Sequence, residues 1–175
     1  GDEDQHDVRA HQLEAATEGR PHAVALDVDD RTDEDEARGE HQTGHQTQAV
    51  QGGGPMSKDD YPFDDGMVPE TLRRIPAEFS TKVKHTRGVV AAAHLDGDND
   101  SATSQFFIET KTNPLWDGKY TIFGRVIEGM DIVDQMVNAP LRTAPKLMDR
   151  PADPVRITKA YLAPRESIAK GNAKP

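Results

Sequence analysis

The chain has 175 residues, with 31 acidic residues, 21 lysines and arginines, and no cysteine. This length fits one domain of ordinary size with tails. The lack of cysteine excludes a disulfide framework, a thiol nucleophile and a cysteine-ligated zinc ion. No apolar run reaches the roughly 18 residues that span a membrane, and the first residues lack the regions of a secretory signal. We therefore expect a soluble, cytoplasmic protein with no membrane partner.

The negative charge is concentrated in residues 1–47, which hold 14 acidic residues against 4 arginines, whereas residues 48–175 are balanced. Phosphates would be repelled by this segment, so we expect no nucleic-acid partner. Residues 1–47 also contain no aromatic residue, isoleucine or methionine. Such a segment buries too little apolar surface to offset an ordering entropy of about 1–2 kcal/mol per residue. We expect it to be disordered, with only residues 23–28 resembling a short strand.

Two origins remain open for residues 1–47. The segment is either a natural acidic extension or a coding sequence read out of frame, because a GC-rich gene in the wrong frame would give this mixture of Asp, Glu, Arg, His, Gln and Thr. Sequencing the coding DNA would distinguish them, since an uninterrupted segment with no better reading frame excludes the second origin.

The packed part of the chain is expected over residues 48–163, because all nine aromatic residues lie at or beyond Tyr61. Residues 52–66 are rich in Gly, Pro and Asp and are predicted to form a loop. Short apolar runs flanked by turn residues then predict strands. These strands cover residues 89–93, 105–108 and 120–127.

A helix and one more strand follow. Residues 130–137 predict a short amphipathic helix with an acidic residue in its first turn, near the positive end of the helix dipole. Its apolar face is predicted to consist of Met130, Val133 and Val137. Residues 155–162 alternate between apolar and polar and predict a closing strand. Residues 164–175 are expected to form a flexible tail.

Five blocks of this sequence, in a fixed order, resemble the cyclophilins, a family of peptidyl-prolyl cis-trans isomerases. They are Gln51-Gly52-Gly53, Ile75-Pro76-Ala77-Glu78-Phe79, Lys84-His85-Thr86-Arg87-Gly88-Val89-Val90, Ser104-Gln105-Phe106-Phe107-Ile108, and Trp116 to Asp131. The resemblance, over about residues 48–163, implies a mainly β fold, a cyclophilin-like β-barrel with a short helix. The barrel is expected to be incomplete, because the family's first strands and first helix precede Gln-Gly-Gly and are not recognisable here.

The resemblance implies a cofactor-free, metal-free isomerase that acts as a monomer on proline-containing peptides or unfolded proteins during protein folding. Rotation about an X-Pro bond crosses a barrier of roughly 18–20 kcal/mol because amide resonance resists twisting. An enzyme lowers this barrier by binding the twisted state more tightly than the planar one. The site therefore needs an apolar pocket for the proline, amide groups for the flanking peptide, and one strong hydrogen-bond donor.

The family's site can be carried over residue by residue. Gln51 and Gln105 correspond to its two glutamines, of which the second holds the substrate backbone, and both are assigned to catalysis. Phe107 corresponds to the floor of the proline pocket. The other substrate-binding positions are Ala93, His94, Leu115, Trp116 and Tyr120, with His94 replacing the usual Asn and Tyr120 replacing a His.

The family's catalytic Arg has no counterpart in this sequence. It lies eight residues before the first glutamine, where this chain has Thr43. One such donor is worth roughly 100- to 1000-fold in rate. Two alternatives to an active isomerase therefore stay open: a non-catalytic, chaperone-like module that binds proline peptides, and an inactive truncated gene product.

Two patterns resemble metal sites. Residues 96–100 resemble the start of a calcium-binding loop, but Ser101 replaces the turn glycine and Phe107 replaces the bidentate glutamate at the twelfth position. His41 and His45 have helical spacing, yet a zinc site would need further ordered ligands. We favour a solvated turn and a solvated tail, and expect no metal.

Overall fold

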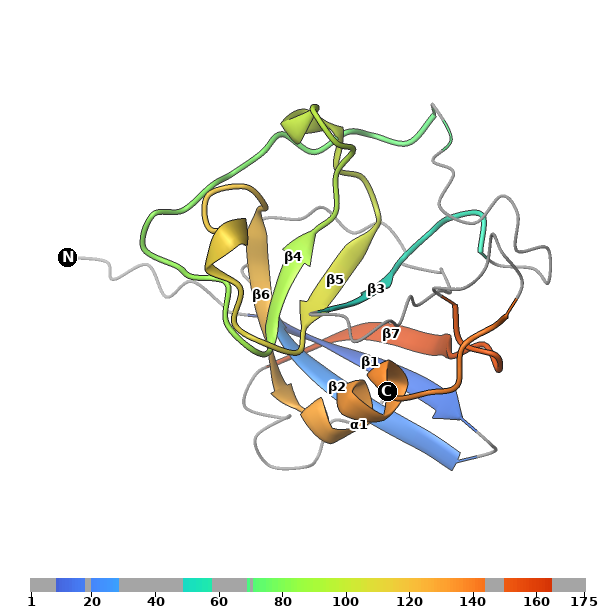
Figure 1. Ribbon diagram of the computed structural model, residues 1–175. Coiled ribbons are helices and arrows are strands. Elements are labelled where there is room, and N and C mark those ends of the chain that lie inside the picture. Colours follow the sequence, from blue (N-terminus) through green and yellow to red (C-terminus); the bar gives the residue numbers. More distant parts are fainter. Residues whose placement is uncertain are drawn as a thin grey trace.

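The computed structural model describes residues 9–17, 20–28, 49–57, 69, 71–143 and 150–164, with side chains described from residue 49 to residue 161 of these ranges. The described residues form seven strands, one α-helix and two short 3-10 helices, which Figure 1 shows in their arrangement. The strands are β1 (Arg9–Thr17), β2 (Arg20–Val28), β3 (Ala49–Gly52), β4 (Val89–Ala92), β5 (Phe106–Glu109), β6 (Ile122–Glu128) and β7 (Arg156–Pro164). The helices are η1 (Asn99–Ser101), η2 (Pro114–Trp116) and α1 (Met130–Val137).

All seven strands belong to one antiparallel sheet with the order β3-β5-β4-β6-β2-β1-β7. Figure 1 shows β4, β5 and β6 side by side, and β1, β2 and β7 as a second group that crosses below them. The mainly β prediction with a short helix is therefore confirmed. Among the described strands β3 and β7 end the hydrogen-bonded order, so closure of the sheet into a barrel stays a prediction.

The predicted strands and the helix lie where the sequence placed them, within one or two residues. Helix α1 begins after Gly129, whose φ of +88° is a left-handed conformation that favours glycine. Strand β7, the predicted closing strand, pairs with β1. The short strand β3 was not predicted, and the expected loop begins only after it.

The expectation of disorder over residues 1–47 is wrong for residues 9–17 and 20–28, which form β1 and β2. The two strands pair with each other along their length, β1 also pairs with β7, and β2 also pairs with β6. The composition argument considered buried side chains alone. It omitted the main-chain hydrogen bonds that two flanking strands offer to any extended segment. The remaining residues of 1–47 lie outside the described ranges, as do residues 58–68 and 165–175.

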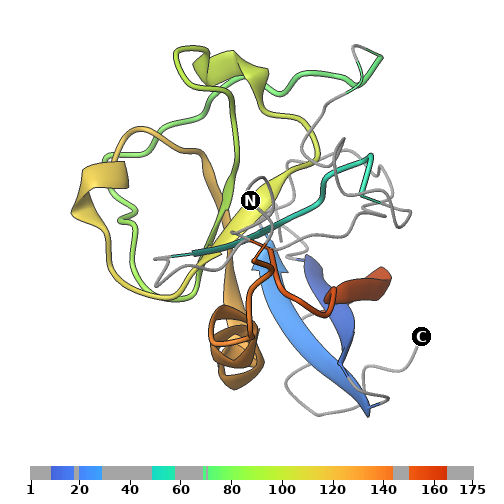
Figure 2. The same ribbon diagram turned by 45° about the vertical axis from the view of Figure 1, so that its right-hand side comes forward.

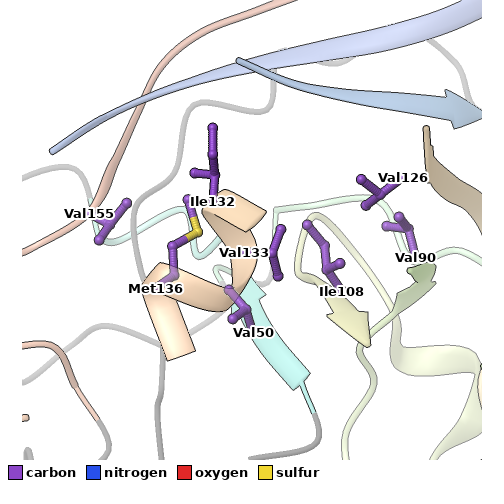
Figure 3. Close-up of a cluster of buried hydrophobic side chains, with 8 residues drawn as sticks. All are labelled: Val50, Val90, Ile108, Val126, Ile132, Val133, Met136 and Val155. Carbon is purple, nitrogen blue, oxygen red and sulfur yellow. The ribbon is translucent and has the colours of Figure 1, made fainter. Parts of the chain in front are cut away.

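One apolar cluster joins α1 to the sheet. Figure 3 shows its members, which are Val50, Val90, Ile108, Val126, Ile132, Val133, Met136 and Val155. Val133 is fully buried and lies beside Ile108 and Val50, so α1 packs on the face that β3 and β5 share. Figure 2 shows α1 at the end of β6 and beside β2.

The apolar face of α1 differs from the predicted one. The buried residues are Ile132, Val133 and Met136, whereas Met130 and Val137 are only partly buried and pack against the edge of the cluster. The core-facing stripe is thus rotated towards Ile132 and Met136, which are four residues apart and lie one above the other on the helix. No helix in the described part of the chain combines the length and apolar character required to cross a bilayer.

Residues 74–78, which precede β4, are hydrogen-bonded to the loop around η1 and to the residue before β6. The Ile75 N–H donates to the Ala102 carbonyl over 2.8 Å, the Ala77 N–H donates to Asp100 Oδ1 over 2.8 Å, and the Glu78 N–H donates to Thr121 Oγ1 over 2.8 Å. Asp98 pairs with Arg74 over 3.0 Å. Two of the acids in the calcium-like loop thus serve as partners for this segment.

Candidate functional site

Three aromatic rings form the centre of the candidate site. Phe107 lies on β5 and is 5% exposed, Trp116 ends η2, and Tyr120 precedes β6. The ring centroids of Phe107 lie 5.1 Å from those of Trp116 and Tyr120, and the Trp116 and Tyr120 centroids are 5.8 Å apart. All three pairs meet edge to face, the arrangement favoured by the quadrupoles of the rings. Because Trp116 and Tyr120 are only half-buried, the cluster is open to solvent on one side.

A buried histidine contacts all three rings. The His85 ring, 1% exposed, lies 6.5 Å from the Phe107 centroid and 6.3 Å from both the Trp116 and the Tyr120 centroids. Its Nδ1 hydrogen-bonds to Oε1 of Glu109, which is fully buried. Burial raises the pKa of the Glu109 carboxyl, although the bond to His85 opposes the shift. Sequence reasoning assigned neither residue to the site.

The main chain of His85 also fixes the loop that carries Leu115 and Trp116. Its N–H donates to Asp117 Oδ1 over 2.9 Å, and its carbonyl accepts from the Asn113 N–H over 3.0 Å. The hydrogen bond from the His85 N–H, together with the Lys84 ammonium 3.2 Å from Asp117 Oδ2, holds the pKa of the Asp117 carboxyl below its ordinary value. The loop is thereby pinned on both sides of Leu115, whose side chain is 76% exposed.

The two predicted glutamines meet across neighbouring strands. Gln51 on β3 lies opposite Phe107 in the register of the sheet, and its Nε2 donates to Oε1 of Gln105 over 2.8 Å. This contact uses one of the two N–H donors of the Gln51 amide.

Gly53 makes this placement possible. It has a φ of +82°, and a Cβ there would lie 2.3 Å from the carbonyl oxygen of Ser104. The Ser104 hydroxyl in turn donates to the Gly53 carbonyl over 2.9 Å. The close approach of these two segments explains the second glycine of the Gln-Gly-Gly block.

Ala93 and His94 lie at the other side of the aromatic centre. The Ala93 N–H donates to the Gln105 carbonyl over 2.9 Å and extends the pairing of β4 with β5 by one residue. The His94 ring stacks on Tyr120, with centroids 4.6 Å apart and planes inclined by 24°. Its two nitrogens lie 2.9 Å from the Leu95 carbonyl and 2.8 Å from the Lys119 carbonyl.

The structure thus gathers most of the predicted site residues around Phe107. Hydrogen bonds link Gln105 to Gln51 and Ala93, and ring contacts link Phe107, Trp116, Tyr120 and His94. The two groups meet where Gln51 lies opposite Phe107 in the register of the sheet. Leu115 adjoins them in the chain. Thr43 lies outside the described residues. The roles of all these residues remain predictions.

In its overall course the chain has the cyclophilin fold. A solved structure titled Cryptosporidium parvum cyclophilin type peptidyl-prolyl cis-trans isomerase cgd2_1660 matches it with a TM-score of 0.68 at 16% identity, covering 89% of this chain and 98% of that one. The same protein in the presence of the dipeptide Ala-Pro gives a TM-score of 0.67 at 17% identity, covering 88% and 98%.

The family model described as cyclophilin type peptidyl-prolyl cis-trans isomerase/CLD matches residues 43–162, and the chain belongs to this family. A peptidyl-prolyl cis-trans isomerase of Acinetobacter baylyi is 38% identical over 119 residues, which are 65% of this chain and 58% of the relative. The isomerase cypE of Dictyostelium discoideum is 36% identical over 113 residues, 63% and 64% of the two chains. The chain thus spans less than two thirds of the length of these relatives. The resemblance inferred from the five blocks is confirmed.

Proposed function

We propose that this chain binds X-Pro segments of peptides and unfolded proteins over the ring cluster of Phe107, Trp116 and Tyr120, and speeds rotation of the X-Pro bond. The observation that carries the proposal is that Gln51, which bonds Gln105, lies opposite Phe107 of the aromatic cluster in the register of the sheet. The rings offer the proline an apolar surface, and the amides offer hydrogen bonds to the adjoining peptide groups. The Ala-Pro dipeptide used with the cgd2_1660 protein supports the same class of ligand.

The rate enhancement is expected to be modest. The site removes the X-Pro peptide from water and holds its flanking groups. This speeds rotation only if the site binds the twisted state more tightly than the planar one. The described residues beside Phe107 offer neutral amides rather than a guanidinium. Two arginines lie in neighbouring segments and have other partners. Arg87, within the Lys84–Val90 block, bonds Asp134, and Arg125, on β6, bonds Thr86.

A second function is favoured by the residue at position 43. With Thr in place of the family's Arg, the site retains its binding surface and loses its strongest donor. A module that binds proline peptides without accelerating exchange, as a chaperone-like protein does, is consistent with that composition. The two functions differ in one measurable quantity, the exchange rate of bound peptide.

The test uses the intact chain, an X-Pro peptide, and Trp116 as reporter, because Trp116 is the sole tryptophan of the chain. We expect saturable changes in Trp116 fluorescence and faster cis-trans exchange of the peptide in two-dimensional exchange NMR. Gln105→Ala is expected to weaken binding about threefold to tenfold, the range of one or two lost hydrogen bonds. Gln135→Ala, an exposed position on α1, serves as the matched control.

The outcomes separate the alternatives. Saturable binding with faster exchange supports the isomerase, and saturable binding with unchanged exchange supports the binding module. No saturable response, from a chain that is folded by its amide spectrum, would contradict both. It would then favour a truncated product without native function.

A further inference from the structure

The two nitrogens of the His94 ring both face main-chain carbonyl oxygens. Nδ1 lies 2.9 Å from the Leu95 oxygen and Nε2 lies 2.8 Å from the Lys119 oxygen. A carbonyl oxygen only accepts, so each contact is a hydrogen bond only if the ring nitrogen carries a proton. A neutral imidazole has one N–H, whereas the imidazolium has two. The observed geometry is therefore satisfied in full by the protonated ring alone.

The ring bridges two segments that flank the aromatic centre. Leu95 follows β4, and Lys119 directly precedes Tyr120. The His94 ring also stacks on Tyr120 at 4.6 Å, within the distance of about 6 Å at which a cation over a tyrosine face is attracted by the ring quadrupole. Protonation thus strengthens three contacts at once, and all three fix the Tyr120 side of the site.

We propose that His94 in its imidazolium form is a positioning residue for Tyr120, so that the affinity of the site for an X-Pro peptide is higher with the ring protonated than with the ring neutral. The proposal rests on the proposed function and deepens it. With the ring neutral, one of the two carbonyls loses its donor and faces a nitrogen lone pair. The bridge then opens on one side, and Tyr120 is free to leave its edge-to-face contact with Phe107.

The charged groups around His94 do not replace this bridge. On the loop that follows β4, Asp98 pairs with Arg74, and Asp100 accepts from the Ala77 N–H. The same loop carries Asp96. These carboxylates favour a cationic ring through the field that they create.

The segment on the opposite side, residues 117–120, carries Lys119, the Tyr120 phenol and Asp117, which is held by Lys84. The ammonium of Lys119 opposes a cationic ring. The other titrating pair that touches Tyr120 is His85 with Glu109. Any pH effect must therefore be assigned by removing His94 itself.

The experiment measures the dissociation constant of one X-Pro peptide by amide NMR at about pH 5.5 and about pH 8, the range in which histidine side chains in general change charge. For the intact chain we expect binding about threefold to tenfold tighter at the lower pH, the range for one hydrogen bond gained. His94→Asn, which stays neutral, is expected to bind equally at both. Tyr120→Phe keeps the stacked ring and the Lys119 carbonyl, so its pH dependence should persist whatever its absolute affinity.

A pH dependence that persists in His94→Asn would overturn the proposal and assign the effect to His85 and Glu109. Equal affinity of the intact chain at both pH values would also overturn it. A second readout needs no peptide: the Tyr120 ring signals should shift between these two pH values in the intact chain and stay fixed in His94→Asn. If no peptide binds at any pH while these signals behave as expected, the proposed function fails and the positioning of Tyr120 by His94 stands.

Discussion

Strands β1 and β2 differ from β4 and β5 in the side chains that their sequences bring to the sheet. Strand β4 is buried at every residue, and β5 contributes Phe107 and Ile108 to the interior, so side chains hold this pair in place. Strands β1 and β2 come from an acidic segment without aromatic residues, and each is paired on both sides by main-chain hydrogen bonds. Neighbouring strands can thus recruit a segment that could not form a core by itself. A binding site needs particular side chains, and these come from strands such as β4 and β5, whose own side chains are buried in the sheet.

Deletion of residues 1–28 should have the largest effect and tests whether the rest of the sheet depends on β1 and β2. The deletion leaves the partner edges of β6 and β7 unpaired along the positions that β2 and β1 occupy. Since net stability is typically about 5–15 kcal/mol, we expect loss of cooperative folding. Urea unfolding followed by circular dichroism measures this, with deletion of residues 165–175 as the control. An unchanged unfolding midpoint would show that the sheet does not depend on β1 and β2.

A smaller effect is expected where a polar pair supports the site. His85→Phe keeps a ring against Phe107 but leaves the Glu109 carboxyl buried without its partner, which costs about 3–5 kcal/mol for a charged group. Burial raises the pKa of Glu109 in the folded chain above its unfolded value. Its neutral form is therefore the better tolerated one, and stability falls as the pH rises through the folded pKa.

This variant is checked by urea unfolding at about pH 4.5 and about pH 7, with the larger loss expected at the higher pH, where a free Glu of pKa ~4.3 is ionised. The double variant His85→Phe with Glu109→Leu should recover much of the loss at about pH 7. An equal loss at both pH values would mean that the pair supports the fold by packing alone.

In the apolar cluster, Met136→Ala should cost about 2–5 kcal/mol in the free energy of unfolding, the range for truncating a large buried residue. Met136 lies in the apolar cluster between α1 and the sheet. The neighbouring Gln135→Ala is exposed and should stay within about 0.5 kcal/mol. Similar losses for the two would contradict the face of α1 described here.

The smallest effect concerns Asp134, which pairs with Arg87 over 2.7 Å on the surface, where both side chains are 44% exposed. The guanidinium holds the pKa of Asp134 below its ordinary value. A lowered folded pKa adds stability above the unfolded pKa that is lost as the pH falls through the folded one. Solvent screening limits this contribution to at most about 1 kcal/mol. Asp134→Asn should remove it at about pH 6 and leave stability unchanged below about pH 2, where an ordinary Asp of pKa ~3.9 is protonated.

Local sequence predicts the parts in which each residue packs against its neighbours. Turn-flanked apolar runs gave β4 and β5, an amphipathic period gave α1, and the motif around Phe107 gave the aromatic centre. The same reasoning found only residues 23–28 of β2 and none of β1, because most of their pairing partners are distant in the chain and their composition argues for disorder. Strand β3 was not predicted because its four residues, Ala49-Val50-Gln51-Gly52, contain no apolar run like those of β4 and β5.

The sequence also does not predict which partners the polar side chains His85, Glu109 and His94 have in the fold. His85 and Glu109 are 24 residues apart, and nothing in either local sequence indicates that they meet inside the fold. The two carbonyls that face His94 come from main-chain geometry, which residue types do not encode. A buried pair of titratable side chains near a recognised motif is the signal that a search could use in other structures.

The close approach of Gly53 to the Ser104 carbonyl has a consequence for how this chain can diverge. Position 53 has no side chain to contact a ligand, yet any larger residue there would push β3 away from the segment that begins β5. Gln51 lies two residues before it and Gln105 one residue after Ser104, so the displacement would separate the two amides. A substitution at position 53, which contacts no ligand itself, would then alter ligand recognition, and no change of side chain at 104 would relieve the clash because it is with the main-chain carbonyl.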